Sequence, residues 1–266
     1  MLALSCSAIL LRKVVFPYQV AKMLPLKKDI KLVRSLHQKK FRNLNGLFFV
    51  EGLKMVQEAL VSSFRVHSLY STQDDFCSKH NGCIKVSEKE MEQLSALSSP
   101  SAHIVVLYQK AQPIPTISGS TLLVLDGISD PGNMGTIMRT AEWFGIKQLL
   151  CTPECVEVYN PKVVQSTMGS IFRVETAYLD VQSLVSTLRS KGYVLIGAEM
   201  NGTDLYEFDF PSKRAIVIGS ESHGLNEEMK QALSNSITIP GHGKAESLNA
   251  SIAASIILAE SFRQGR

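Results

Sequence analysis

The chain has 266 residues, with 45% apolar and 20% charged residues and a net charge of +4. This composition is typical of a soluble globular protein with one large or two small domains. No segment reaches ~18 uninterrupted apolar residues, so a membrane span is not expected. The five cysteines are irregularly spaced, which fits neither a disulfide framework nor a zinc site. We therefore expect free thiols, no metal and a cytoplasmic location.

The first 22 residues are predicted to be a disordered or spurious extension. Residues 1–11 are apolar and are followed by Arg12 and Lys13. A secretory signal carries its positive charges before the apolar run, so the order here is reversed. Translation can start at Met1 or at Met23, and the sequence leaves both open.

Residues 23–111 are predicted to form a small α/β domain. Apolar spacing indicates helices near 32–36, 53–60 and 87–97, and strands at 47–50, 66–70 and 104–108. Basic residues crowd the stretch from Lys22 to Lys54, where Asp29 and Glu51 are the only acidic residues. Such a patch can neutralise nucleic-acid phosphates, and the alternative is a solvated helix face. The residues that we assign to phosphate contacts are Lys39, Lys40 and Arg42.

Residues 112–120 have the composition of a linker, with two prolines that interrupt regular structure. Residues 121–266 then alternate between strands at 122–125, 148–151, 171–174, 194–198, 215–218 and 236–239 and helices near 136–144, 162–168, 181–189, 226–233 and 247–263. This alternation predicts a mostly parallel sheet covered on both faces. The last helix is apolar on nearly every side, so we expect it to be buried inside the fold or against a partner subunit.

The segment from Asp126 to Arg139 follows an apolar strand and leads into a helix. A strand, a tight loop and a helix start together form a cleft at the carboxyl end of a sheet, where α/β proteins bind ligands. Ile137 and Ala141 belong to the core stripe of the helix, while Arg139 is rotated ~200° from Ile137. We expect Asn133 and Arg139 to face this cleft; the alternative for Arg139 is an ordinary solvated side chain.

Two later segments have the same strand-to-turn character. In the first, a strand runs into Gly219, and Glu221 and Gly224 follow before a helix. In the second, a strand ends at Pro240, and after a glycine-containing loop Ser247 is predicted to be the N-cap of the last helix. Each segment alone is a weak signal.

Together, in this order, the three segments resemble the SpoU (TrmH) family of RNA ribose 2′-O-methyltransferases within the SPOUT superfamily. The matching positions are Asn133, Gly135, Arg139 and Ala141 for the first motif, Gly219, Glu221 and Gly224 for the second, and Ile239, Pro240, Ser247, Leu248 and Asn249 for the third. The stretch from Gly46 to Lys54 is similar to the substrate-binding domain of members that act on ribosomal RNA. The resemblance covers roughly residues 26–262.

The resemblance implies a small N-terminal α/β RNA-binding domain and a C-terminal Rossmann-like methyltransferase domain, residues 121–266, with a parallel sheet and a trefoil knot. Knots are nearly absent from proteins in general, so the knot is an expectation of the family alone. The family also implies S-adenosyl-L-methionine as cofactor, RNA as substrate, favouring ribosomal RNA, and a homodimer.

The roles of individual residues are likewise implied by the resemblance. Arg139 would hold the 2′-oxygen and the adjacent phosphate, and a role as base stays open if the substrate phosphate takes part. The residues assigned to catalysis are Arg139, Asn133, Glu221, Ser247 and Asn249, and those assigned to the cofactor are Gly219, Ile239 and Leu248.

Three other functions are kept as alternatives. The first is a transfer RNA 2′-O-methyltransferase, and the second is a catalytically idle RNA-binding or ribosome-assembly factor on the same fold. The third, a nicotinamide-dependent dehydrogenase, is disfavoured because the loop at Gly132 and Gly135 lacks the spacing of a dinucleotide-binding fingerprint.

Overall fold

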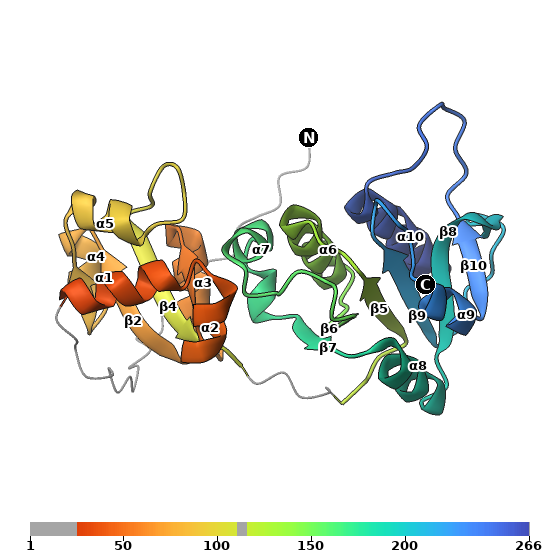
Figure 1. The fold of residues 1–266 in the computed structure, drawn as a ribbon, viewed down its shortest axis with the longest axis horizontal. Coiled ribbons are helices and arrows are strands. Elements are labelled where there is room, and N and C mark those ends of the chain that lie inside the picture. Colours follow the sequence, from red (N-terminus) through yellow and green to blue (C-terminus); the bar gives the residue numbers. More distant parts are fainter. Residues whose placement is uncertain (1–25, 111–115, 266) are drawn as a thin grey trace, which may run out of the picture.

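The computed structural model describes residues 26–110 and 116–265. It contains two sheets, one before and one after the segment 111–115 (Figure 1). The predicted extension at residues 1–22 and part of the predicted linker at 112–120 lie outside the described residues. None of the helices in the described part of the chain combines the length and apolar character needed to span a bilayer.

The first sheet has four strands in the order β1-β4-β2-β3. Strand β4 is antiparallel to both of its neighbours, and β2 and β3 are parallel. The strands are β1 Leu47–Glu51, β2 Val66–Ser71, β3 Cys83–Lys85 and β4 His103–Tyr108, and the helices are α1 Leu26–Ser35, α2 Lys39–Asn45, α3 Leu53–Val61, α4 Asp74–Lys79 and α5 Glu88–Leu94. The short elements α2, α4 and β3 were not predicted from the sequence.

The second sheet has six parallel strands in the order β10-β8-β9-β5-β6-β7, as the alternation of elements predicts. The strands are β5 Thr121–Asp126, β6 Gln148–Cys151, β7 Glu175–Tyr178, β8 Val194–Asp204, β9 Arg214–Gly219 and β10 Asn235–Thr238; the helices are α6 Pro131–Trp143, α7 Pro161–Ser166, the 3-10 helix η1 Ser170–Phe172, α8 Val181–Ser190, α9 Glu227–Ala232 and α10 Ala250–Gln264. Apolar residues of α6, α7 and α10 bury one face of the sheet, and those of α8 and α9 bury the other.

The predicted strand at 171–174 is wrong. Residues Ser170–Phe172 form η1, and pairing with β6 begins only at Glu175. The backbone of Gly169 has a φ of 101°, and the Phe172 N–H donates to its carbonyl at 3.1 Å, which closes the turn. The apolar side chains of Ile171 and Phe172 are buried by this turn. A short apolar run therefore does not distinguish a strand from a buried turn.

In the six-stranded part, helices α6 and α10 begin several residues away from their predicted starts. Helix α6 begins at Pro131, because the Asp130 side chain accepts a hydrogen bond from the Asn133 N–H at 2.8 Å. Helix α10 begins at Ala250, and its N-cap is Asn249, whose side chain accepts from the N–H groups of Ser251 and Ile252. The prediction of Ser247 as the N-cap is therefore wrong.

The two sheets share one hydrophobic core, which includes residues of β1 and α3 as well as those of β5, α6 and α7. The ring of Phe48 in β1 lies 4.5 Å from that of Tyr159, and the ring of Phe64 lies 5.7 Å from that of Phe172. Aromatic contacts of this kind bury large apolar areas. They fix the four-stranded part against the six-stranded part.

Candidate active site

Three polar side chains from distant parts of the sequence meet beside the N-terminus of α6. The Asn133 side-chain amide donates a hydrogen bond to Glu221, and its carbonyl oxygen accepts one from Asn249 at 2.9 Å. Glu221 also accepts from the Ala250 N–H at 3.4 Å. Glu221 and Asn249 are exposed and Asn133 is half-buried. The structure thus brings together one predicted residue from each motif, on a surface that a ligand can reach.

The loop that presents Glu221 is tightly folded. The backbone of Ser220 and Gly224 exchanges two hydrogen bonds, of 3.0 and 2.9 Å. A Cβ atom at Gly219 would lie only 2.5 Å from the Gly224 carbonyl oxygen, and Gly224 itself has a φ of 67°. Both positions therefore require glycine for the loop itself. The predicted close approach of Gly219 to a ligand is a separate property, and it stays a prediction.

Asp126, at the end of β5, holds the other end of this loop. Its carboxylate accepts hydrogen bonds of 2.7 Å from both the backbone and the side-chain amide of Asn226, and one of 3.1 Å from Thr152. The pair Asp126 and Asn226 thereby anchors the loop of Glu221 to the central strand. The sequence prediction missed this role, although Asp126 opens the segment from Asp126 to Arg139 and Asn226 is the first residue of the helix predicted near 226–233.

Arg139 lies on α6 with an exposed side chain, while Ile137 and Ala141 are fully buried. The helix therefore places the guanidinium on its outer face, as the helical spacing predicts.

The remaining predicted residues lie near the third motif. Ile239 is half-buried against the core, directly after β10. Residues 241–249 are exposed throughout, including Ser247, and the Leu248 side chain has 46% of its surface exposed. Figure 1 shows this segment extending away from the sheet between β10 and α10. Ser247 and Leu248 directly precede Asn249, which belongs to the polar cluster with Asn133 and Glu221.

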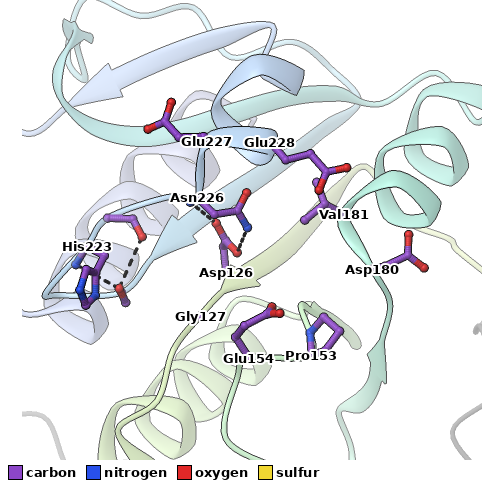
Figure 2. Close-up of a pocket in the computed structure, with 12 residues that line it drawn as sticks. Asp126, Gly127, Pro153, Glu154, Asp180, Val181, His223, Asn226, Glu227 and Glu228 are labelled. Carbon is purple, nitrogen blue, oxygen red and sulfur yellow. Dashed lines mark hydrogen bonds between the residues drawn. The ribbon is translucent and has the colours of Figure 1, made fainter.

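A cavity of about 610 Å³ lies at the carboxyl ends of the strands, and its lining includes Asp126, His223 and Asn226 (Figure 2). Its lining includes the carboxylates of Glu154, Asp180, Glu227 and Glu228, together with Asp126. So many negative charges repel a phosphate backbone. This cavity is therefore an unsuitable place for a nucleic acid.

The predicted basic patch contains one error. Lys39 and Lys40 are exposed on α2, but the Arg42 side chain is buried, with 2% of its surface exposed. Its guanidinium forms an ion pair with Glu157 and donates to the Leu36 carbonyl at 2.7 Å. Arg42 is therefore not available to phosphates, because its donors are used inside the protein. Within residues 26–110 and 116–265, no group of three or more His, Cys, Asp or Glu is placed to hold a metal ion.

Comparison with known proteins agrees with this geometry. Residues 120–259 match the SpoU rRNA Methylase family, and residues 27–104 match the MRM3-like substrate binding domain. The chain is 26% identical over 230 residues to the 23S rRNA (guanosine(2553)-2′-O)-methyltransferase RlmP of Bacillus subtilis, covering 85% of this chain and 92% of that protein.

Two solved structures have the same overall fold. The AdoMet-bound rRNA methyltransferase of Sinorhizobium meliloti superposes with a TM-score of 0.81 at 28% identity, covering 92% of this chain and 98% of that one. The SpoU methyltransferase AviRb of Streptomyces viridochromogenes, in complex with AdoMet, superposes with a TM-score of 0.80 at 25% identity, covering 89% and 97%. With a family match over more than half of its length, the chain belongs to the SpoU rRNA Methylase family.

Proposed function

We propose that this protein transfers the methyl group of S-adenosylmethionine to a ribose 2′-hydroxyl of ribosomal RNA. The observation that carries the proposal is the hydrogen-bonded cluster of Asn133, Glu221 and Asn249. This cluster lies at the N-terminus of α6, the helix that also carries the exposed Arg139. The three motifs are far apart in the sequence, yet their polar residues converge. A catalytically idle factor would not require this convergence.

The third-motif segment suits the proposed cofactor. S-adenosylmethionine supplies a methyl group on a sulfonium, which is already a good leaving group. Its adenine ring needs an apolar side chain beside accessible backbone groups. The half-buried Ile239, the exposed Leu248 and the exposed backbone between them offer both. In our proposal Gly219 completes this site from the neighbouring loop.

The protein has to position the ribose hydroxyl and to stabilise the negative charge that develops on its oxygen. The oxygen attacks the methyl carbon as the carbon–sulfur bond breaks, and the hydroxyl proton is released to the solvent. The Arg139 guanidinium can bind the 2′-oxygen and the adjacent phosphate at once. An arginine stays protonated at neutral pH, so it serves better as this clamp than as the base that removes the proton. Asn133 and Glu221 would orient Arg139 and the ribose by hydrogen bonds, with Ser247 and Asn249 at the edge of the same site.

A methyl-transfer assay tests the proposal. Purified protein is given methyl-labelled S-adenosylmethionine with either ribosomal or transfer RNA, and the modified nucleotide is mapped by its resistance to alkaline hydrolysis. We expect one ribose of ribosomal RNA to be labelled. Labelling of transfer RNA alone would favour the alternative substrate, and RNA binding without transfer would identify an idle factor.

The exposed lysines of α2 are proposed to bind RNA phosphates. We expect Lys39→Ala and Lys40→Ala to weaken RNA binding, because each bound phosphate releases counterions. Each substitution should also flatten the slope of log affinity against log salt concentration by ~0.7 to 0.9 for every phosphate that is no longer neutralised. Binding measured across a salt series checks this. Lys89→Ala is the control, since Lys89 is exposed between Glu88 and Glu90. Equal slopes for all variants would make the patch an ordinary solvated face.

One face of α10 is proposed to bind a second copy of the chain. Ile252 has 51% of its surface exposed and Ile256 is half-buried, and on α6, which packs against α10, Trp143 is 84% exposed. Burying this apolar surface favours association. We expect a dimer in sedimentation velocity and a monomer for Ile252→Glu. Leu44→Glu, at an apolar residue that is 75% exposed on α2, should stay dimeric. A monomeric wild-type protein would contradict the proposal.

Two further features belong to the same proposal. A trefoil knot at the third motif stays a prediction of the family resemblance. A cytoplasmic location is supported by the four cysteines within the described residues, all of which are free thiols.

A further inference from the structure

Arg173, which follows η1, binds carboxylates from two separate parts of the protein. Its Nε and Nη2 atoms donate to the two oxygens of Glu142 on α6, the second at 3.3 Å. Its Nη1 atom donates to Glu58 on α3 at 2.8 Å. Burial raises the pKa of Glu142, but hydrogen bonds from Arg173 and Ser170 outweigh it and lower the pKa overall. The Arg173 guanidinium thus forms a fork between two helices, with each of its three nitrogens donating to a carboxylate.

The two helices have different roles in the proposed function. Helix α6 carries Asn133 and Arg139, and Glu142 lies three residues after Arg139. Helix α3 belongs to the four-stranded part of the protein, whose helix α2 carries Lys39 and Lys40. Arg173 therefore links the helix of the reaction directly to the part proposed to hold RNA.

The turn before Arg173 is shaped around this contact. A Cβ atom at Gly169 would lie 2.8 Å from the Glu58 carboxyl carbon, so the carboxylate rests directly on the glycine backbone. Gly169 has a φ of 101°, and the preceding Met168 has a φ of 50°, which a side chain such as methionine rarely adopts. Such backbone strain persists where the surroundings impose it. The positive φ values of Met168 and Gly169 therefore indicate that the surrounding structure maintains the contact between Glu58 and this turn.

Stability alone does not account for this arrangement. The Arg173 side chain is 47% exposed, and ion pairs at such sites contribute little to folding. The aromatic contacts of Phe48 and Phe64 already hold the two parts together. The Arg173 guanidinium adds a restraint on orientation, because its planar donors bind one carboxylate on α3 and one on α6 and so favour one relative placement of the two helices.

We propose that Arg173 is a positioning residue for methyl transfer, which sets α6 relative to the RNA-binding part so that the bound ribose meets Arg139. This inference rests on the proposed function. Small displacements of a reacting group reduce rates strongly. Loss of the fork should therefore lower the turnover of bound RNA and leave the binding of each substrate nearly unchanged.

The test uses Arg173→Gln and Glu58→Gln in the full-length protein. Glu58→Gln removes the negative charge from the link to α3 but keeps the pair of Arg173 with Glu142, and it preserves side-chain shape. We expect the single-turnover rate at saturating RNA and S-adenosylmethionine to fall tenfold or more for Arg173→Gln and severalfold for Glu58→Gln. The dissociation constants of both substrates should stay within about threefold of wild type. Arg173→Lys should recover part of the rate.

The control is Lys85→Gln, which removes an exposed ion pair of 2.7 Å with Asp74 within the four-stranded part. It should leave the rate unchanged. The inference would be overturned if Arg173→Gln and Glu58→Gln both react at the wild-type rate. It would also be overturned if Lys85→Gln lowers the rate as much as they do. An inactive wild-type protein would instead refute the proposed function, so the two failures are distinguishable.

Discussion

Replacement of Arg139 by alanine is expected to abolish detectable methyl transfer, a loss of at least ~100- to 1,000-fold in the single-turnover rate. Removal of one donor that stabilises developing negative charge has an effect of this size in other enzymes. The fold should survive, because Arg139 is exposed on α6 while Ile137 and Ala141 hold the helix in the core. Rapid-quench measurements with ribosomal RNA check the rate, and calorimetry checks that S-adenosylmethionine still binds.

Arg139→Lys tests whether the planar shape of the Arg139 guanidinium is needed, or only its positive charge. A lysine keeps the positive charge but cannot bind an oxygen and a phosphate in parallel, so we expect this variant to fail as well. Arg189→Ala is a matched control, since Arg189 is an exposed arginine on α8, outside the basic stretch from Lys22 to Lys54. Near-normal turnover by Arg139→Lys would show that a point charge is sufficient and would refute the assignment of Arg139 as a clamp.

The sequence allowed the parallel sheet to be predicted because its signal is local. Each strand is a short apolar run, and a helix with its own apolar stripe follows most of them. The position of Arg139 also follows from local geometry, since only its rotation from Ile137 matters. Where a local signal was ambiguous the prediction failed, as at residues 171–174, because a buried turn and a buried strand are both apolar.

The composition of the candidate site was predictable only through the resemblance of three motifs. No spacing rule connects Asn133 with Glu221 and Asn249, which are separated by 88 and 116 residues in the chain. The helix starts were misplaced for a related reason. Ser247 and Asn249 are both good N-cap residues, and the choice of Asn249 accompanies its bond to Asn133, which is a tertiary contact.

The failure at Arg42 has the same physical origin. A cluster of basic residues without acidic neighbours predicts an exposed patch, and for Lys39 and Lys40 that holds. The partner of Arg42 is Glu157, which is 115 residues away and belongs to the six-stranded part. Local charge patterning contains no information on such a partner. The buried pair therefore became visible only in the folded protein, where it fixes α2 against the segment between β6 and α7.

This buried pair leads to the largest expected effect on stability. Arg42→Ala should lower the free energy of unfolding by about 3–5 kcal/mol, because it leaves Glu157 as an uncompensated charge in a site where 14% of its side chain is exposed. The Leu36 carbonyl also loses its donor. Urea unfolding of the variant and the wild type measures the difference.

Two further variants test the physical cause. Lys39→Ala removes an exposed charge from the same helix and should change the free energy of unfolding by no more than about 0.5 kcal/mol. The double variant Arg42→Met with Glu157→Met removes both charges together, and it should recover much of the stability, since apolar residues of similar size can replace a buried pair. If Arg42→Ala destabilised no more than Lys39→Ala, the guanidinium would have to be solvated, and Arg42 would again be a candidate for binding RNA phosphates.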